Sequence, residues 1–150
     1  MAKLKIDGDM LAEALESHDD GSWYLDLETG EFLLHSHFGD NDLLNEEELE
    51  AHSERYRYVE PIDSFEGFRI MEDFVETLPE GEAKHMLARA LTRPKPFRNF
   101  KDDLYEVPDV RQQWFEYHHK AMWKMAEDWL RYEEIDAEML TGPEFYKDKQ

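Results

Sequence analysis

The chain has 150 residues, with 37 Asp and Glu against 17 Lys and Arg, which gives a net charge of −20. It contains no cysteine, so disulfides, thiolate metal sites and thiol catalysis are excluded. Its 20 aromatic residues supply the apolar area that a disordered acidic chain lacks. We therefore expect one globular domain over residues 1–132 and a weakly patterned C-terminal tail over residues 133–150.

The N-terminal sequence MAKLKIDGDM lacks the continuous apolar stretch of a signal peptide. Elsewhere, no run of residues approaches the roughly 20 apolar residues of a membrane span. These features predict a cytoplasmic protein without a membrane partner. A surface this acidic repels nucleic-acid backbones and attracts basic partners, although solubility alone would also explain the charge.

The first part of the chain predicts one short helix, a hairpin and a third strand. Asp7 or Asp9 can cap a short helix that carries a single apolar stripe. The alternating pattern SWYLDLETGEFLLHSHF predicts a β-hairpin over residues 22–38. A Glu-rich surface helix is expected within residues 40–52, and aromatic and β-branched side chains predict a third strand over residues 55–60.

The clearest helical pattern begins near Ser64. Asp63 and Glu66 stand in the D-x-x-E relation of a capping box, which places the start of the helix there. Large apolar side chains recur on one face as far as Leu78, and charged side chains occupy the other face. Gly67 costs about 1 kcal/mol against alanine in the first turn, which indicates the close approach of a neighbouring backbone.

Three more helices are predicted over residues 82–93, 97–104 and 108–132. The last of them presents a broad apolar arc that should face inward: Trp114, Phe115, His118, Ala121, Met122, Met125, Ala126 and Trp129. Trp123 falls outside this arc. Taken together, the elements predict an α+β fold, with a small three-stranded antiparallel sheet from residues 22–38 and 55–60 covered by four to five helices.

One long stretch resembles a known family. The sequence RYRYVEPIDSFEGFRIMEDFV, followed by LARAL, FRNFKDDL and a helix carrying WF and AxxWL, is similar to the bacterial Uncharacterised Protein Family 0158. The WYLDLETGE hairpin is similar as well, so the resemblance spans about residues 4–132. It implies a fold and a bacterial cytosolic setting, and it carries over no catalytic residue. The chain departs from the family at TRPKP, residues 92–96, where members tend to carry a glycine-containing link.

Charge is distributed unevenly along the sequence. Residues 1–82 hold 24 acidic and 5 basic residues, whereas residues 83–101 hold six basic residues and no acidic one. On the predicted helix, three of the cations or histidines recur every four residues and therefore share one stripe. With the cations that follow, they form what we call the basic strip: His85, Arg89, Arg93, Lys95, Arg98 and Lys101.

The basic strip has two interpretations. Guanidinium groups suit phosphate oxygens, so the strip could bind a nucleic acid or a phosphorylated ligand. In so acidic a protein, the same cations could instead pair with carboxylates of its own surface. Phe97 and Phe100 could act as base-stacking platforms, but their helical spacing with Leu104 favours packing into the core.

A metal site is a weaker hypothesis. His35 and His37 lie on one face of a predicted strand, and Asp40 or Asp42 follows them closely. Two histidines do not make the three ligands that such a site needs. We therefore assign no metal ligand, and the sequence contains no motif that predicts a cofactor.

For catalysis, Asp63 with Glu82 and Lys84 has the residue types that some metal-dependent nucleases use. That arrangement belongs on adjacent strands, whereas both carboxylates fall at predicted helix starts, where capping explains them better. The sequence also lacks a nucleophile elbow and a phosphate-cradling glycine loop. We therefore predict a non-catalytic interaction or regulatory protein with a protein partner. Nucleic-acid or phospho-ligand binding through residues 84–101 is the alternative, and a metal-dependent hydrolase ranks behind both.

Overall fold

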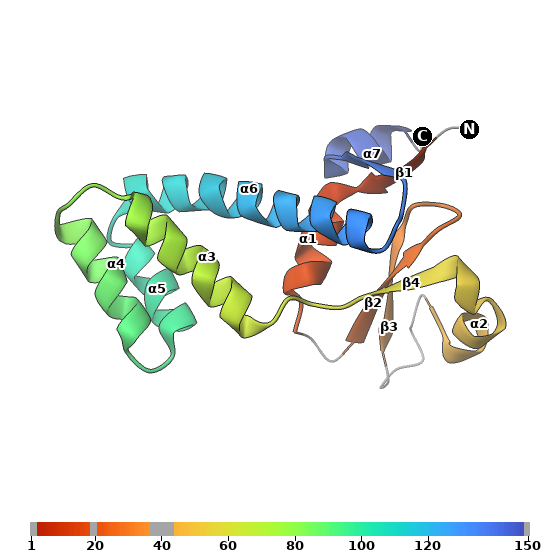
Figure 1. The fold of residues 1–150 in the computed structure, drawn as a ribbon, viewed down its shortest axis with the longest axis horizontal. Coiled ribbons are helices and arrows are strands. Elements are labelled where there is room, and N and C mark those ends of the chain that lie inside the picture. Colours follow the sequence, from red (N-terminus) through yellow and green to blue (C-terminus); the bar gives the residue numbers. More distant parts are fainter. Residues whose placement is uncertain (1–2, 19–20, 37–43, 149–150) are drawn as a thin grey trace. The chain divides into compact units, whose positions relative to one another are not determined.

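The protein is described here by a computed structural model that covers residues 3–18, 21–36 and 44–148. These residues cluster into two compact units. The sheet unit comprises residues 1–61 and 122–150, and the helical unit comprises residues 62–121 (Figure 1). Helix α6 (Pro108–Tyr132) contributes to both units.

The predicted α+β class and the three-stranded antiparallel sheet are confirmed. The strands, in the spatial order β3-β2-β4, are β2 (Gly21–Asp26), β3 (Phe32–Ser36) and β4 (Tyr56–Val59). Trp23 in β2 lies opposite Leu34 in β3 and Val59 in β4, so one register holds all three strands. Helix α2 (Glu46–Ala51) and a 3-10 turn (Ser53–Arg55) lead into β4.

A second, two-stranded sheet in the sheet unit has no counterpart in the sequence prediction. Strand β1 (Leu4–Asp7) pairs in parallel with β5 (Ala137–Leu140). Helix α7 (Gly142–Asp148) follows β5, and its Phe145 side chain is only 2% exposed. The segment in which the sequence shows only a weak pattern therefore forms a strand and a helix.

Helix α1 (Gly8–Glu16) begins where the sequence predicts. The Asp7 carboxylate caps it by accepting hydrogen bonds from the backbone N–H groups of Asp9 and Met10, at 3.0 and 3.2 Å. Burial raises the pKa of Asp7 above its ordinary value. Gly8 is required because the Trp123 ring fills the space beside it, only 2.5 Å from where a Cβ atom would stand.

The sheet unit also contains a partly buried ion pair between Asp26, which is buried, and Arg55, whose side chain is 29% exposed. The Arg55 Nε and Nη2 atoms donate to the two carboxylate oxygens at 2.9 and 2.8 Å, and the Glu28 N–H donates at 2.9 Å. Burial of Asp26 favours its neutral form, but these hydrogen bonds outweigh that effect. The pKa of Asp26 therefore lies below its ordinary value.

The helical unit contains α3 (Ser64–Thr77), α4 (Glu82–Thr92), α5 (Pro96–Leu104) and the first part of α6 (Figure 1). Asp63 accepts a hydrogen bond from the Glu66 N–H at 2.9 Å, which confirms this half of the predicted capping box. Aromatic rings dominate the core of this unit, and the centroid of Trp114 lies 5.3 Å from that of Phe74 and 5.0 Å from that of Phe100. Aliphatic and thioether side chains complete it: Met71, Val75, Leu78, Leu87, Leu91 and Leu104.

Several details of the predicted packing are wrong. Phe115, expected to face inward, is 47% exposed, and Phe97 is 38% exposed although Phe100 is fully buried. Tyr117, three residues after Trp114, packs against the core instead. Gly67 approaches the edge of the Phe97 ring, 3.3 Å from where a Cβ atom would stand, rather than a neighbouring backbone.

Helix α6 is the longest element, with 25 residues. Its charged residues keep it too polar to cross a bilayer. None of the other helices in the described part of the chain is long and apolar enough to do so either.

Candidate functional site

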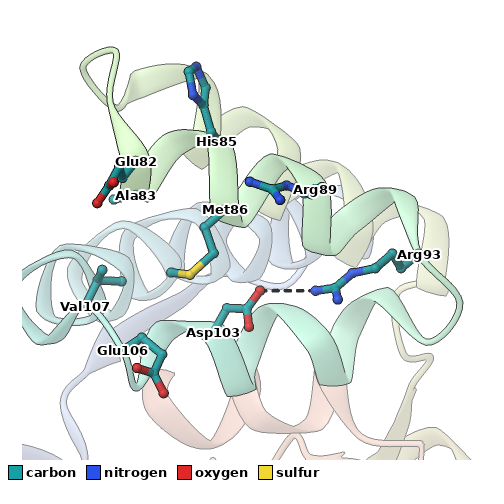
Figure 2. Close-up of a pocket in the computed structure, with 9 residues that line it drawn as sticks. All are labelled: Glu82, Ala83, His85, Met86, Arg89, Arg93, Asp103, Glu106 and Val107. Atoms are coloured by element: carbon teal, nitrogen blue, oxygen red, sulfur yellow. Dashed lines mark hydrogen bonds and ion pairs between the residues drawn. The ribbon is translucent and has the colours of Figure 1, made fainter.

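A groove of about 610 Å³ opens on the helical unit between α4 and the end of α5 (Figure 2). Both helices and the turn after α5 contribute side chains to it. We call it the α4–α5 groove and define it by its lining: Glu82, Ala83, His85, Met86, Arg89, Arg93, Asp103, Glu106 and Val107.

The sequence of α4 explains one wall of the groove. Leu87, Ala90 and Leu91 recur at helical spacing and are buried in the core. The polar residues fall on the other face because 3.6 residues make one turn. Lys95, between two prolines, adopts a left-handed backbone (φ 61°, ψ 56°) and connects α4 to α5. The hairpin formed by these two helices places the end of α5 beside α4 (Figure 1).

The members of the basic strip that line the groove differ in their partners. The Arg93 Nη2 atom lies 3.3 Å from Asp103 Oδ2, as the dashed line in Figure 2 shows. The His85 Nε2 atom lies 3.4 Å from a carboxylate oxygen of Glu80. Arg89 is exposed, and no carboxylate among the described residues lies within ion-pair distance of it. Arg89 is therefore available for a ligand.

The other three members of the basic strip lie outside the groove lining. Arg98 is 4.0 Å from Asp102, and both side chains are largely exposed, so this pair is weak. Lys95 and Lys101 are exposed and pair with no carboxylate in the described part of the chain. The structure thus divides the predicted strip into a groove-lining part and an outer part, and self-pairing accounts for only some of its members.

Sequence reasoning missed the carboxylates of the groove. Glu82 lies just before the acid-free segment, and Asp103 and Glu106 lie just after it. A linear charge count therefore separates them from the cations that they join in space. Only Glu82 carried a usable indication, because it stands three and seven residues before His85 and Arg89 on the same predicted helix and therefore shares their face.

The weak metal hypothesis finds no support in the described residues. His37, Asp40 and Asp42 lie outside them. His35 is buried at 7% exposure, and its Nδ1 atom lies 2.9 Å from the Leu44 carbonyl oxygen. In the ranges that the structure covers, no three His, Asp or Glu side chains are grouped so that they could hold a metal ion.

The residues of the nuclease-like hypothesis have separate local roles. Asp63 caps α3. The Lys84 Nζ atom lies 3.3 Å from a carboxylate oxygen of Glu80. Glu82 lines the α4–α5 groove. The predicted capping role is therefore confirmed for Asp63, whereas Glu82 is the first residue of α4 and its capping role stays a prediction.

An exposed aromatic cluster follows the groove in sequence. The Arg111 guanidinium lies 4.3 Å from the ring centroid of Tyr105 and 5.1 Å from that of Phe115. Both rings are substantially exposed, at 66% and 47%. Such cation–π contacts hold a guanidinium in place at a surface, and Tyr and Arg are enriched among the residues that dominate protein interfaces.

Comparison with known proteins places the chain in a family. The profile of the "Uncharacterised protein family (UPF0158)" matches residues 1–142. A Pseudomonas aeruginosa protein named as a UPF0158 protein is 34% identical over 143 residues, which cover 95% of this chain and 92% of the relative. No solved structure matches the chain. The resemblance inferred from the sequence is confirmed, and the chain belongs to the uncharacterised protein family UPF0158.

Proposed function

We propose that this protein is a non-catalytic interaction protein and that it binds a protein partner through the α4–α5 groove. The environment of Arg89 supports this proposal most directly. Its guanidinium stands exposed in a concave surface, with no carboxylate partner among the described residues, while Arg93 beside it is paired. A partner can supply the missing carboxylate. The cysteine-free, acidic composition supports a cytoplasmic setting for this interaction.

The mixture of charges in the groove favours a protein over a nucleic acid. Glu82, Asp103 and Glu106 line the same hollow as the two arginines. A polyanion would meet these carboxylates at close range and be repelled. A protein surface carries both acidic and basic side chains. It can therefore place basic groups beside the carboxylates of the groove and acidic groups beside its arginines.

Nucleic-acid or phospho-ligand binding is the second candidate, and one observation favours it. Lys95 and Lys101 are exposed without carboxylate partners in the described chain, so the outer part of the basic strip could contact phosphates. If it does, affinity for a single-stranded oligonucleotide should fall steeply between about 50 and 200 mM salt. Affinity that is absent, or independent of salt, would eliminate this candidate.

Site-specific photo-crosslinking in cells of the source organism tests the proposed function. A photo-crosslinking amino acid at Ala83, inside the groove, should capture one discrete partner protein. The same group at Gln112, an exposed position of α6 outside the groove lining, should not capture it.

Charge reversals provide the matched control. Arg89→Glu should abolish the Ala83 adduct. Lys120→Glu, the same charge change at another exposed position of the helical unit, should preserve it. Equal capture from Ala83 and Gln112, or an adduct that survives Arg89→Glu, would contradict the proposal.

A further inference from the structure

We infer that the α4–α5 groove selects an amphipathic helix of the partner that carries opposite charges at positions i and i+7, with apolar residues at i+3 and i+4. This inference rests on the proposed function and specifies the chemistry of the partner. It follows from the arrangement of charge, apolar surface and distance along the groove.

The two ends of the groove carry opposite charge. Glu82 and Glu106 lie toward one end and Arg93 lies toward the other, with its partner Asp103 between them (Figure 2). Arg89 adds a second guanidinium to the latter end, so that end keeps a positive charge after Arg93 is paired. Neither glutamate has an ion pair with a described residue. A single ligand can therefore satisfy a cation site and an anion site at once.

The Met86 side chain lies between the charged ends. It points from α4 toward α5 across the middle of the groove, whereas Ala83 and Val107 line the end that holds Glu82 and Glu106 (Figure 2). Methionine is flexible and polarisable, so it adapts to apolar side chains of different shape. The middle of the groove therefore suits a pair of aliphatic residues.

The spacing of the charges fits a helix. Glu82 and Arg89 are seven residues apart on α4, which is about 10.5 Å along the helix axis at 1.5 Å per residue. A partner helix that lies along α4 presents residues i and i+7 on one face at the same separation, with i+3 and i+4 between them. An extended segment would alternate its side chains between two faces and would turn every second one away. Helix-in-groove binding is a common mode of peptide recognition.

A second copy of this chain is an unsuitable occupant. Each copy carries a net charge of −20, and the long-range repulsion between two such molecules opposes their association. The partner is therefore a different protein whose docking helix has this pattern of charges.

Three designed peptides test the inference by fluorescence anisotropy against the full-length protein. All share a 15-residue, helix-favouring Ala/Gln scaffold. The first has Lys and Glu at i and i+7 around Leu at i+3 and i+4. The second keeps the composition but moves the charges to the opposite face, and the third carries Glu at both positions. The first should bind at least tenfold more tightly than either of the others.

Charge reversal and rescue make the test specific. Arg89→Glu should weaken binding of the first peptide at least tenfold, and a peptide with Lys in place of its Glu should recover that loss on the variant. Lys120→Glu should leave the first peptide's affinity unchanged. Circular dichroism checks that the exposed replacement leaves the fold intact.

Three outcomes would overturn the inference. These are equal affinity of the first and second peptides, tighter binding of the third peptide than of the first, or an unchanged affinity of the first peptide for the Arg89→Glu variant. The crosslinking experiment separates this failure from failure of the proposed function. If Ala83 gives a discrete adduct but the three peptides bind equally tightly, only the inferred charge pattern of the partner helix is wrong, and the proposed function stands. Selective peptide binding without an adduct in cells contradicts the proposed partner and leaves the peptide specificity established.

Discussion

The sheet unit and the helical unit use charge in different ways. The sheet unit holds 25 acidic and eight basic residues, a net charge of −17, whereas the helical unit holds 12 and nine, a net charge of −3. The buried polar residues among those described are Asp7, Asp26 and His35, and all belong to the sheet unit. The described buried residues of the helical unit are apolar.

This contrast separates charges that support folding from charges that are available for binding. In the sheet unit, the two carboxylate oxygens of Asp26 accept hydrogen bonds from Arg55, and Asp7 caps a helix. In the helical unit, packing of rings and aliphatic side chains provides the interior. Its arginines remain at the surface, and the α4–α5 groove gathers two of them. The nearly neutral unit, rather than the strongly acidic one, therefore carries the better candidate site.

Removing an aromatic ring from the helical core should have the largest effect on stability. Phe100→Ala deletes a fully buried side chain and should lower the free energy of unfolding by about 3–5 kcal/mol, because it leaves a cavity. Phe97→Ala removes the same group at 38% exposure and should cost less than about 1.5 kcal/mol. Urea denaturation measures both. Equal losses would contradict the view that apolar burial holds this unit together.

Replacing the aspartate of an Asp–Arg pair by alanine should lower the free energy of unfolding more in the sheet unit than in the helical unit. Asp26→Ala in the sheet unit removes a buried acceptor of Arg55 and Glu28 and should cost about 2–4 kcal/mol. Asp103→Ala in the helical unit breaks a pair whose Arg93 is 53% exposed, and it should cost about 0–1 kcal/mol. Chemical denaturation at pH 7 should show this order, and the reverse order would contradict it.

The pH dependence of Asp26→Ala follows from the lowered pKa of Asp26. A carboxylate with a folded-state pKa below its unfolded-state value stabilises the fold above the unfolded-state pKa, which is about 3.9. That contribution is lost as the pH falls through the folded-state pKa. The stability gap between wild type and Asp26→Ala should therefore be constant from pH 7 to about pH 5 and shrink below about pH 4. A gap that widens on acidification would show that the sign is wrong.

Two glycines should respond differently to alanine. Gly30 has φ 81°, and a Cβ atom there would stand only 1.9 Å from the Lys5 carbonyl oxygen, which is backbone. Gly30→Ala should therefore cost about 2–3 kcal/mol. Gly67→Ala meets only the partly exposed Phe97 ring, and the gain in helix propensity of about 1 kcal/mol should offset that contact. Thermal denaturation of both variants tests this, and a large loss at Gly67 would contradict the packing described for α3 and α5.

The sequence predicts the features of the fold that depend on neighbouring residues. The cap at Asp63, the start of α1 after Asp7 and the hairpin strands follow from local rules, and the structure confirms them. The β1–β5 pair does not follow from such rules. Its partners, such as Leu4 and Ala137, are far apart in the sequence, and four-residue strands give too little alternation to recognise.

The groove was only partly predictable for the same reason. His85, Arg89 and Arg93 share a stripe of one helix, and their spacing alone places them together. Asp103 and Glu106 join them because the chain reverses after α4, which the spacing within one helix does not reveal. The exposure of aromatic residues on α5 and α6 was harder still, because a helix face can contain more apolar side chains than its neighbours cover.

The smallest effect concerns the turn between α4 and α5, where Lys95 stands between two prolines. Lys95 adopts φ 61°, which costs a residue with a Cβ atom about 1–2 kcal/mol. Lys95→Gly removes that strain but increases the entropy of the unfolded chain, so the net gain should be about 0.5–1 kcal/mol. Lys101→Gly, the same replacement inside α5, should instead cost about 1 kcal/mol. Lys95→Gly should raise the melting temperature. Because Lys95 lies outside the groove lining, the replacement should not change the affinity for the first designed peptide, which has Lys and Glu at i and i+7. A lower melting temperature together with a weaker peptide affinity would show that the turn needs the lysine side chain itself.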